Sequence, residues 1–83
     1  MNTCVKVRLF ARFRDAIGKD VIDVSLLDGT TVKVLRGQLA LLHPEMATLL
    51  VRSHVAVNDE LAADDVVIGP RDEIAILPPV SGG

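Results

Sequence analysis

A single amphipathic helix set between two groups of strand-like segments is the feature that most restricts how this chain folds. The apolar stripe of the helix has four members, at spacings of three, four and three residues: Val32, Leu35, Leu39 and Leu42. Such spacing is typical of a helix that buries one face. Thr31 precedes the stripe and is a predicted N-cap. Three long polar side chains are predicted to point away from the stripe: Lys33, Arg36 and Gln38.

The helix contains one unfavourable residue and has a clear end. Gly37 costs a helix about 1 kcal/mol relative to alanine, so we expect the helix to lie close against a sheet at that point. Pro44 cannot continue the helix because proline lacks a backbone N–H group. Residues 45–51 then predict a second, short helix whose inward side chains are Met46, Leu49 and Leu50.

Alternation of apolar and polar residues predicts strands on both sides of the helices. Before the main helix, strands are predicted over residues 4–10 and 21–26, with a short helical or irregular segment over residues 11–17 between them. After the helices, strands are predicted over residues 54–58, 61–63 and 73–77. The last of these is a continuous apolar run, which favours a central position in the sheet.

This order of elements favours an α+β fold of the β-grasp, or ubiquitin-like, type. It consists of a mixed sheet of about five strands packed on one main helix, with a second short helix. The helical crossover places the first strand parallel to the last strand. A ferredoxin-like arrangement of the same elements is the alternative. We predict a β-grasp domain over residues 1–77 and an extended C-terminal tail over residues 78–83.

Composition argues against several classes of protein. With 83 residues, the chain forms one small domain. Only Phe10 and Phe13 are aromatic and the net charge is −2, so the basic and aromatic surface of a nucleic-acid-binding protein is missing. The longest apolar stretch, residues 74–80, contains two prolines and is far shorter than the roughly 20 residues of a membrane span. We therefore expect neither a nucleic-acid partner nor a membrane partner.

Cysteine usage and charge give two further expectations. A single cysteine, Cys4, and no recognisable leader predict a reducing, cytoplasmic location. Residues 1–36 carry seven Lys or Arg and four Asp or Glu, a net charge of +3. Residues 37–83 carry two and seven, a net charge of −5. This asymmetry fits ordinary solvated surface or a surface that orients a partner.

The sequence contains no catalytic constellation. His43, His54 and Cys4 lack the spacing of a zinc site, so no metal site is predicted. Cys4 has no identifiable base and is predicted to be a buried or partly buried structural thiol. The paired carboxylates at 64–65 and 72–73 are predicted to stay solvated, and no glycine-rich phosphate loop is found.

The most informative segment is the C-terminal sequence Pro78-Pro79-Val80-Ser81-Gly82-Gly83. The prolines end the last strand and the glycines have no side chains, so this segment is suited to enter a narrow site on another protein. A frayed terminus is the alternative. A terminal carboxylate is a poor electrophile, and it needs activation by a nucleotide-binding protein, for instance as a mixed anhydride with AMP. The chain is therefore predicted to be a carrier whose own C-terminus reacts.

Several segments together resemble the small subunit of molybdopterin synthase. They are residues 5–11, residues 14–18, Thr31-Val32, Leu35-Arg36, residues 55–58, residues 72–75 and the Pro-Pro-Val-Ser-Gly-Gly ending. The resemblance covers nearly the whole chain. The ending is its most specific part, although some related sulfur carriers and protein modifiers share it.

The resemblance implies a sulfur carrier in molybdenum cofactor biosynthesis, the non-catalytic sulfur-donor subunit of a two-subunit sulfurtransferase. An adenylyltransferase related to ubiquitin-activating enzymes would use ATP and magnesium to adenylate Gly83, and a sulfurtransferase would convert it to a thiocarboxylate. The large synthase subunit would bind cyclic pyranopterin monophosphate and receive the sulfur, within a heterotetramer of two small and two large subunits. The chain itself is expected to bind no cofactor.

The resemblance also implies which residues act. Gly82 and Gly83 carry the chemistry, and partner contacts are implied for Phe10, Arg14, Leu61, Leu77, Pro78, Pro79, Val80 and Ser81. For Phe10, Leu61 and Leu77, a place in the core or at its rim is the alternative. Relatives often have glycine where this chain has Pro70-Arg71, so the turn type there is not predicted. Two other functions are alternatives: a protein modifier joined to lysines through Gly83, and a sulfur carrier for thiamine or cysteine synthesis. The extended tail favours the synthase subunit over a thiamine carrier and does not exclude the modifier.

Overall fold

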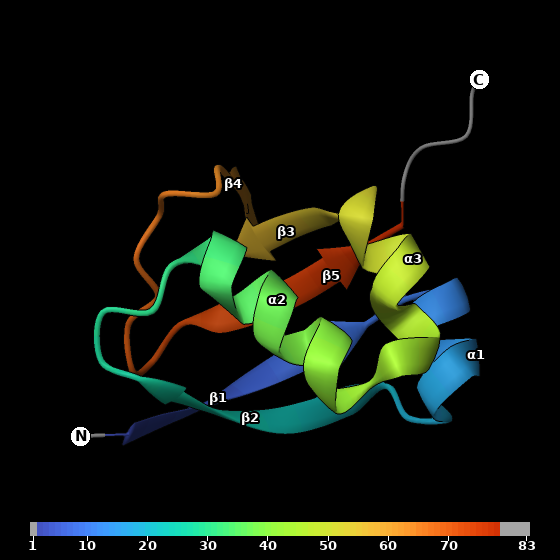
Figure 1. Ribbon diagram of the computed structural model, residues 1–83. Coiled ribbons are helices and arrows are strands. Elements are labelled where there is room, and N and C mark those ends of the chain that lie inside the picture. The colour runs from blue at the N-terminus through green and yellow to red at the C-terminus, as the bar shows by residue number, and fades with distance from the viewer. Residues whose placement is uncertain (1, 79–83) are drawn as a thin grey trace.

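The computed structural model describes residues 2–78, which fold into a sheet packed against short helices (Figure 1). In chain order the elements are β1 (Asn2–Leu9), α1 (Arg12–Ile17), β2 (Val21–Leu27), α2 (Val32–Leu42), the 3-10 helix η1 (Pro44–Met46), α3 (Ala47–Val51), β3 (His54–Val57), β4 (Glu60–Ala62) and β5 (Glu73–Leu77). Over these residues, no helix is long and apolar enough to cross a membrane.

The strands form one mixed sheet in the order β2-β1-β5-β3-β4. β1 pairs antiparallel with β2 and parallel with β5, while β3 pairs antiparallel with both β5 and β4. Helices α2 and α3 lie on the same side of the sheet (Figure 1). The parallel pairing of the first and last strands around a helical crossover is the predicted β-grasp topology, and the ferredoxin-like alternative is wrong. The prediction that β5 is central is also confirmed.

The core lies between the sheet and α2. The side chains predicted to point inward from β1 are buried, at 2% exposed for Val5, 0% for Val7 and 2% for Leu9. The other large buried side chains come from every helix, from the neighbouring strands and from the loop before β5: Phe13, Val24, Leu26, Val32, Leu35, Leu39, Met46, Leu50, Val55, Ile68, Ile74 and Ile76. The predicted N-cap is also found, because the Val34 N–H group donates to Thr31 Oγ1 across 3.4 Å.

Two predictions about α2 are wrong. Leu42 was expected in the apolar stripe but is 57% exposed. Leu42 points within about 20° of the buried Leu35, seven residues earlier, so its direction does not explain its exposure. Leu42 is the last residue of the helix. Gly37 does not lie against the sheet, because a Cβ atom added to it would meet nothing within 4 Å.

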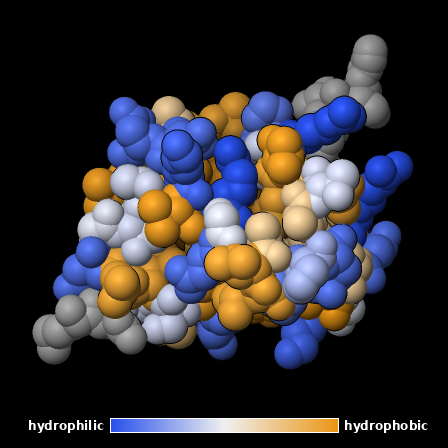
Figure 2. Space-filling model, in the orientation of Figure 1, coloured by the Kyte–Doolittle hydropathy of each residue, from blue (hydrophilic) through white to orange (hydrophobic). Residues whose placement is uncertain are grey.

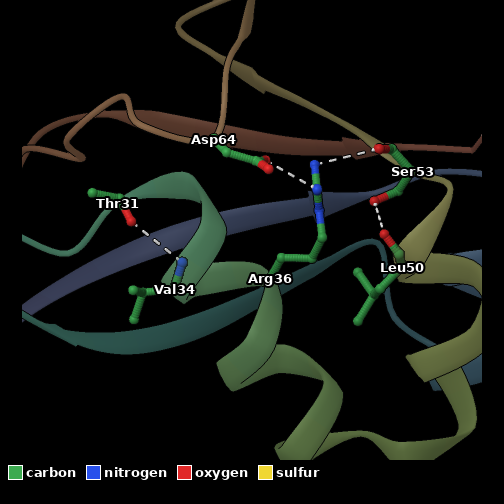
Figure 3. A network of polar contacts seen from close by, with 6 residues as sticks. All are labelled: Thr31, Val34, Arg36, Leu50, Ser53 and Asp64. Atoms are coloured by element: carbon green, nitrogen blue, oxygen red, sulfur yellow. Dashed lines mark hydrogen bonds and ion pairs between the residues drawn. The ribbon is translucent and has the colours of Figure 1, made fainter.

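Two of the polar side chains that flank the stripe of α2 contact other segments of the chain. The Gln38 amide donates to the Ser25 carbonyl of β2 across 2.8 Å. Arg36 reaches toward β3 and the loop after β4, where its guanidinium donates to Asp64 and to the Ser53 carbonyl (Figure 3). Lys33 alone of the three is exposed as expected. Long side chains at the flanks of the buried stripe therefore tie α2 to its surroundings.

The type of the turn before β5 was not predicted from the sequence. Hydrogen bonds between the residues of the turn stabilise it. The Asp72 N–H group donates to the Gly69 carbonyl across 3.2 Å, as in a β-turn. The Asp72 side chain accepts in return from the Gly69 N–H group across 2.6 Å. Asn58 joins this turn to the end of β3, because its amide donates to Asp72 Oδ1 across 2.9 Å. The start of β5 is thereby held beside β3.

Candidate functional site

No helix within residues 2–78 covers the face of the sheet opposite α2 and α3, and we call it the open face. Along β1 the buried Val5, Val7 and Leu9 alternate with exposed residues that point to this face: Cys4, Lys6 and Arg8. The expectation that Cys4 is buried or partly buried is therefore wrong, since its thiol is exposed. The opposite, helical side is the one seen in Figure 2, where apolar and polar side chains are interspersed over α2 and α3.

One row of side chains crosses the open face through all five described strands. The strand register places Leu61 beside Ala56, and Ala56 beside Ala75. The row continues from Ala75 to Arg8 and from Arg8 to Val21. Leu61 is 71% exposed and Val21 is 38% exposed. The row is thus apolar except at Arg8.

A second apolar group lies where β5 ends. Leu77 is paired with His54 of β3, and Leu9 of β1 is paired with Ile76. Phe10 therefore follows β1 at the level of Leu77. The Phe10 side chain is 42% exposed, and Leu77 is half-buried. The open face thus has exposed apolar surface at the end of the sheet from which the chain continues to its C-terminus.

The strand register places Leu61 and Leu77 on the open face, and Phe10 follows β1 at its edge. These are the three apolar residues that the family resemblance singled out. Phe10 and Leu61 are too exposed to belong to the core, while Leu77 and Pro78 are half-buried at the edge of the open face. The remaining tail residues named from the sequence lie outside the described residues: Pro79, Val80, Ser81, Gly82 and Gly83.

Arg14 lies on α1 at the same end of the sheet. Its Nε atom is 3.8 Å from Asp20 Oδ1, and the side chains of both residues are more than half exposed. Arg14 and Asp20 also line a hollow of about 380 Å³ together with Arg8, Leu9, Phe10 and Val21. Arg14 is therefore a neighbour of the open face, and its ion pair leaves the guanidinium accessible to another protein.

The thiol of the open face lies away from the apolar group that contains Leu77. Cys4 is paired with Ser25 near the start of β1. Because β1 runs parallel to β5, this thiol lies at the opposite end of the sheet from Leu77. Within residues 2–78, no three His, Cys, Asp or Glu side chains are grouped so that they could hold a metal ion.

Sequence reasoning missed Arg8, Ala56, Ala75 and Val21 as members of this face. The alternation along β1 does indicate that Arg8 points away from the core. Its neighbours in the row come from distant parts of the chain, however, and only the strand register identifies them.

Comparison with known proteins agrees with the fold and the resemblance. The profile of the ThiS family matches residues 7–83. The chain is 40% identical to the molybdopterin synthase sulfur carrier subunit of Dictyostelium discoideum over 87 residues, with 100% of both chains covered. The small archaeal modifier protein 1 of Haloferax volcanii is similar in structure, with a TM-score of 0.83, 26% identity, and coverage of 94% of this chain and 99% of that chain.

A third similarity is to a protein solved together with a partner. A chain in the complex of subunits 1 and 2 of the molybdopterin-converting factor from Helicobacter pylori superposes with a TM-score of 0.67. It is 27% identical, and the match covers 98% of this chain and 100% of that chain. The family resemblance predicted from the sequence is thereby confirmed.

Proposed function

Because the chain belongs to the ThiS family, we propose that it is the sulfur carrier subunit of a molybdopterin synthase and donates sulfur from its C-terminal residue, Gly83. One observation carries the proposal. The alignment with the Dictyostelium sulfur carrier subunit, at 40% identity, covers 100% of this chain and so reaches its Gly82-Gly83 end. The proposed reactions take place in the cytoplasm.

Sulfur loading begins with activation of Gly83 by an adenylyltransferase that holds ATP and magnesium. The Gly83 carboxylate attacks the α-phosphate of ATP, pyrophosphate leaves, and an acyl adenylate forms. A sulfurtransferase then delivers a sulfur nucleophile, at the oxidation level of sulfide, to the acyl carbon. AMP leaves and Gly83 ends in a thiocarboxylate. Both enzymes are separate proteins, so this chain contributes the reacting group and no catalytic side chain.

Sulfur transfer takes place in the complex with the large synthase subunit, which binds cyclic pyranopterin monophosphate. The thiocarboxylate sulfur is the nucleophile, and hydrolysis of the acyl group left after transfer restores the carboxylate of Gly83. Two such rounds supply the two dithiolene sulfurs of molybdopterin. We propose an assembly of two small and two large subunits, and the Helicobacter complex of subunits 1 and 2 supports such a partnership.

The open face supports this role because it exposes apolar surface next to the outgoing C-terminal segment. Phe10, Leu61 and Leu77 are proposed to pack against the partner proteins, as large apolar side chains do at interfaces. Arg14 adds a charged contact at the same end. The tail residues Pro78, Pro79, Val80 and Ser81 then pass along the partner toward its active site, and Gly82 and Gly83 enter it.

The test is to reconstitute the pathway from purified proteins. The chain is incubated with the adenylyltransferase, ATP, magnesium and a sulfur donor, and its intact mass and C-terminal fragment are measured. We expect one oxygen of Gly83 to be replaced by sulfur. The large subunit and cyclic pyranopterin monophosphate are then added, and molybdopterin is expected to form as the thiocarboxylate disappears. A Gly83 that is not loaded would contradict the proposal.

Loaded sulfur that the large subunit does not consume would instead favour a carrier for thiamine or cysteine synthesis. A second candidate function, protein modification, is favoured by the structural similarity to the small archaeal modifier protein 1. It requires an isopeptide bond between Gly83 and lysines of other proteins. Mass spectrometry of cell extracts distinguishes the two, because only a modifier yields branched peptides that contain Gly82-Gly83.

A further inference from the structure

Arg8 is a cation of the open face that lacks an ionic partner in the described part of the chain. The other cations near it are paired: Lys6 Nζ lies 3.4 Å from Asp23 Oδ1, and Arg14 Nε lies 3.8 Å from Asp20 Oδ1. The Arg8 side chain makes no ion pair and no hydrogen bond with any residue from 2 to 78. Its guanidinium is therefore satisfied by solvent alone there.

The surroundings of Arg8 are those that a partner protein would cover. Its row neighbours are Ala75 and Val21, and the row continues to the exposed Leu61. A protein that packs on this row removes water from the guanidinium as well. Arginine cannot release its proton to become neutral, and an unpaired charge buried in an interface costs much of the binding free energy. A partner on this row must therefore supply a counter-charge.

The place for the counter-charge is the hollow of about 380 Å³ that begins at Arg8. Its walls are Arg8, Leu9, Phe10, Arg14, Asp20 and Val21. Asp20, the acid among them, is already beside Arg14. Phe10 and Val21 give the hollow apolar walls. Arg8 gives it a positive charge that makes no ion pair within residues 2–78, although Glu73 lines a neighbouring hollow together with Arg8. A short apolar stem that ends in a carboxylate matches this combination.

We propose that the large synthase subunit inserts an aspartate or glutamate side chain into this hollow and that the carboxylate accepts hydrogen bonds from the Arg8 guanidinium. The stem of the acidic side chain packs between Phe10 and Val21. The inference rests on the proposed function, because it concerns the protein that receives the open face. Arg8 then selects among partners, since a protein without a carboxylate at this place would leave the arginine buried and unpaired.

The first test is calorimetric titration of the large subunit with the full-length chain. The variant is Arg8→Glu, and Lys33→Glu is the matched control because it makes the same charge change at an exposed residue of α2, away from the open face. We expect Arg8→Glu to weaken binding at least about tenfold and Lys33→Glu to change it less than about twofold. Raising the salt concentration should reduce the difference in affinity between the two variants, because salt screens the charges. The unfolding temperature of Arg8→Glu should equal that of the unmodified chain.

The outcomes separate this inference from the function on which it rests. If the unmodified chain binds the large subunit and Arg8→Glu binds it as tightly as Lys33→Glu does, the inference about Arg8 is overturned and the proposed function is retained. If the unmodified chain does not bind at all, the proposed function is overturned and the inference with it.

A second test identifies the acidic residue directly. Arg8→Lys places a primary amine at position 8, and a carbodiimide joins this amine to a carboxylate in contact with it, with loss of water. Mass spectrometry of the digested complex is expected to show residue 8 linked to an aspartate or glutamate of the large subunit. Links only to this chain's own Asp20 or Glu73, or to a second copy of the chain, would overturn the inference.

Discussion

Arg36 Nη1 lies 3.1 Å from Asp64 Oδ1, and this ion pair joins the middle of α2 to the loop after β4. Arg36 Nη2 also donates to the Ser53 carbonyl across 3.4 Å, just before β3 begins (Figure 3). One guanidinium therefore holds three segments that are far apart in the sequence. Because Ser53 in turn donates to the Leu50 carbonyl across 2.8 Å, the end of α3 is fixed to the same group.

Replacing Arg36 by alanine should lower the free energy of unfolding by about 2 kcal/mol, because hydrogen bonds from a charged donor are lost and the Ser53 carbonyl loses a partner. Urea unfolding followed by circular dichroism measures the loss. Asp64→Ala should lower the free energy of unfolding by only about 0.5 kcal/mol, because the Asp64 carboxylate is largely solvated. Arg52→Ala is the control, because Arg52 is exposed and its side chain has no bond to another described residue. If Arg36→Ala and Arg52→Ala lowered the free energy of unfolding equally, the contacts of Arg36 would not stabilise the fold.

Gly37→Ala should raise the free energy of unfolding by about 1 kcal/mol, the difference in helix propensity between the two residues. The new methyl group has room, because nothing lies within 4 Å of the added Cβ atom. Gly29→Ala is the matched comparison. The Cβ atom there also has room, but Gly29 has a φ of +84°, which strains alanine, so this variant should be less stable by about 1 kcal/mol. Stabilities that change in the same direction would refute the backbone argument.

Leu39→Ala and Leu41→Ala should differ strongly although both lie in α2. Leu39 is 0% exposed, and a leucine deleted from a core costs about 2 to 5 kcal/mol. Leu41 is 84% exposed, so its truncation should leave the stability nearly unchanged. Thermal unfolding of the two variants gives the comparison. A large loss from Leu41→Ala would show that the exposed side of α2 is covered in solution.

The fold was predictable because most elements show their buried face in a short window of sequence. Alternation along β1 identified Val5, Val7 and Leu9, and the helix stripe identified Val32, Leu35 and Leu39 correctly. The prediction that Leu42 is buried was wrong because periodicity does not show where a helix ends or how far the sheet extends beneath it. The hydrogen bonds that Arg36 and Gln38 make with other segments of the chain depend on tertiary packing, which no local sequence pattern contains.

The candidate site was less accessible to sequence reasoning. Phe10, Leu61 and Leu77 were named from a family resemblance, and nothing local indicates that they share a face. That relationship arises from the pairing of β1 with β5, of β5 with β3, and of β3 with β4. Arg8 was visible as an outward residue of a strand, but its apolar neighbours Ala75 and Val21 were not. Register between distant strands is set by the whole core rather than by any one segment.

Leu61→Ala should weaken binding to the large subunit about tenfold or more, as the truncation of a central apolar contact does at protein interfaces. The free energy of unfolding of the Leu61→Ala variant should change little, because Leu61 is 71% exposed. Leu41→Ala is the matched control: it removes the same atoms from an exposed leucine on the helical side. Titration calorimetry with both variants measures the effect. Equal affinities would show that the open face does not contact the large subunit.

Deleting Gly83 should abolish sulfur loading without changing the unfolding temperature. Glycine has no side chain to bury, and the buried core of the described residues 2–78 lies between Val5 and Ile76, so we expect the deletion to leave that core intact. The deletion withdraws the carboxylate by about 3.5 Å, the length of one extended residue, which is enough to remove it from the α-phosphate of ATP. Gly82→Ala and Gly82→Val form a graded series, in which loading by the adenylyltransferase should fall as the side chain grows. Loading is measured as ATP-dependent pyrophosphate release together with intact mass. Normal loading of the deletion variant, or a matching loss of thermal stability, would show that Gly83 is not a reacting group separate from the fold.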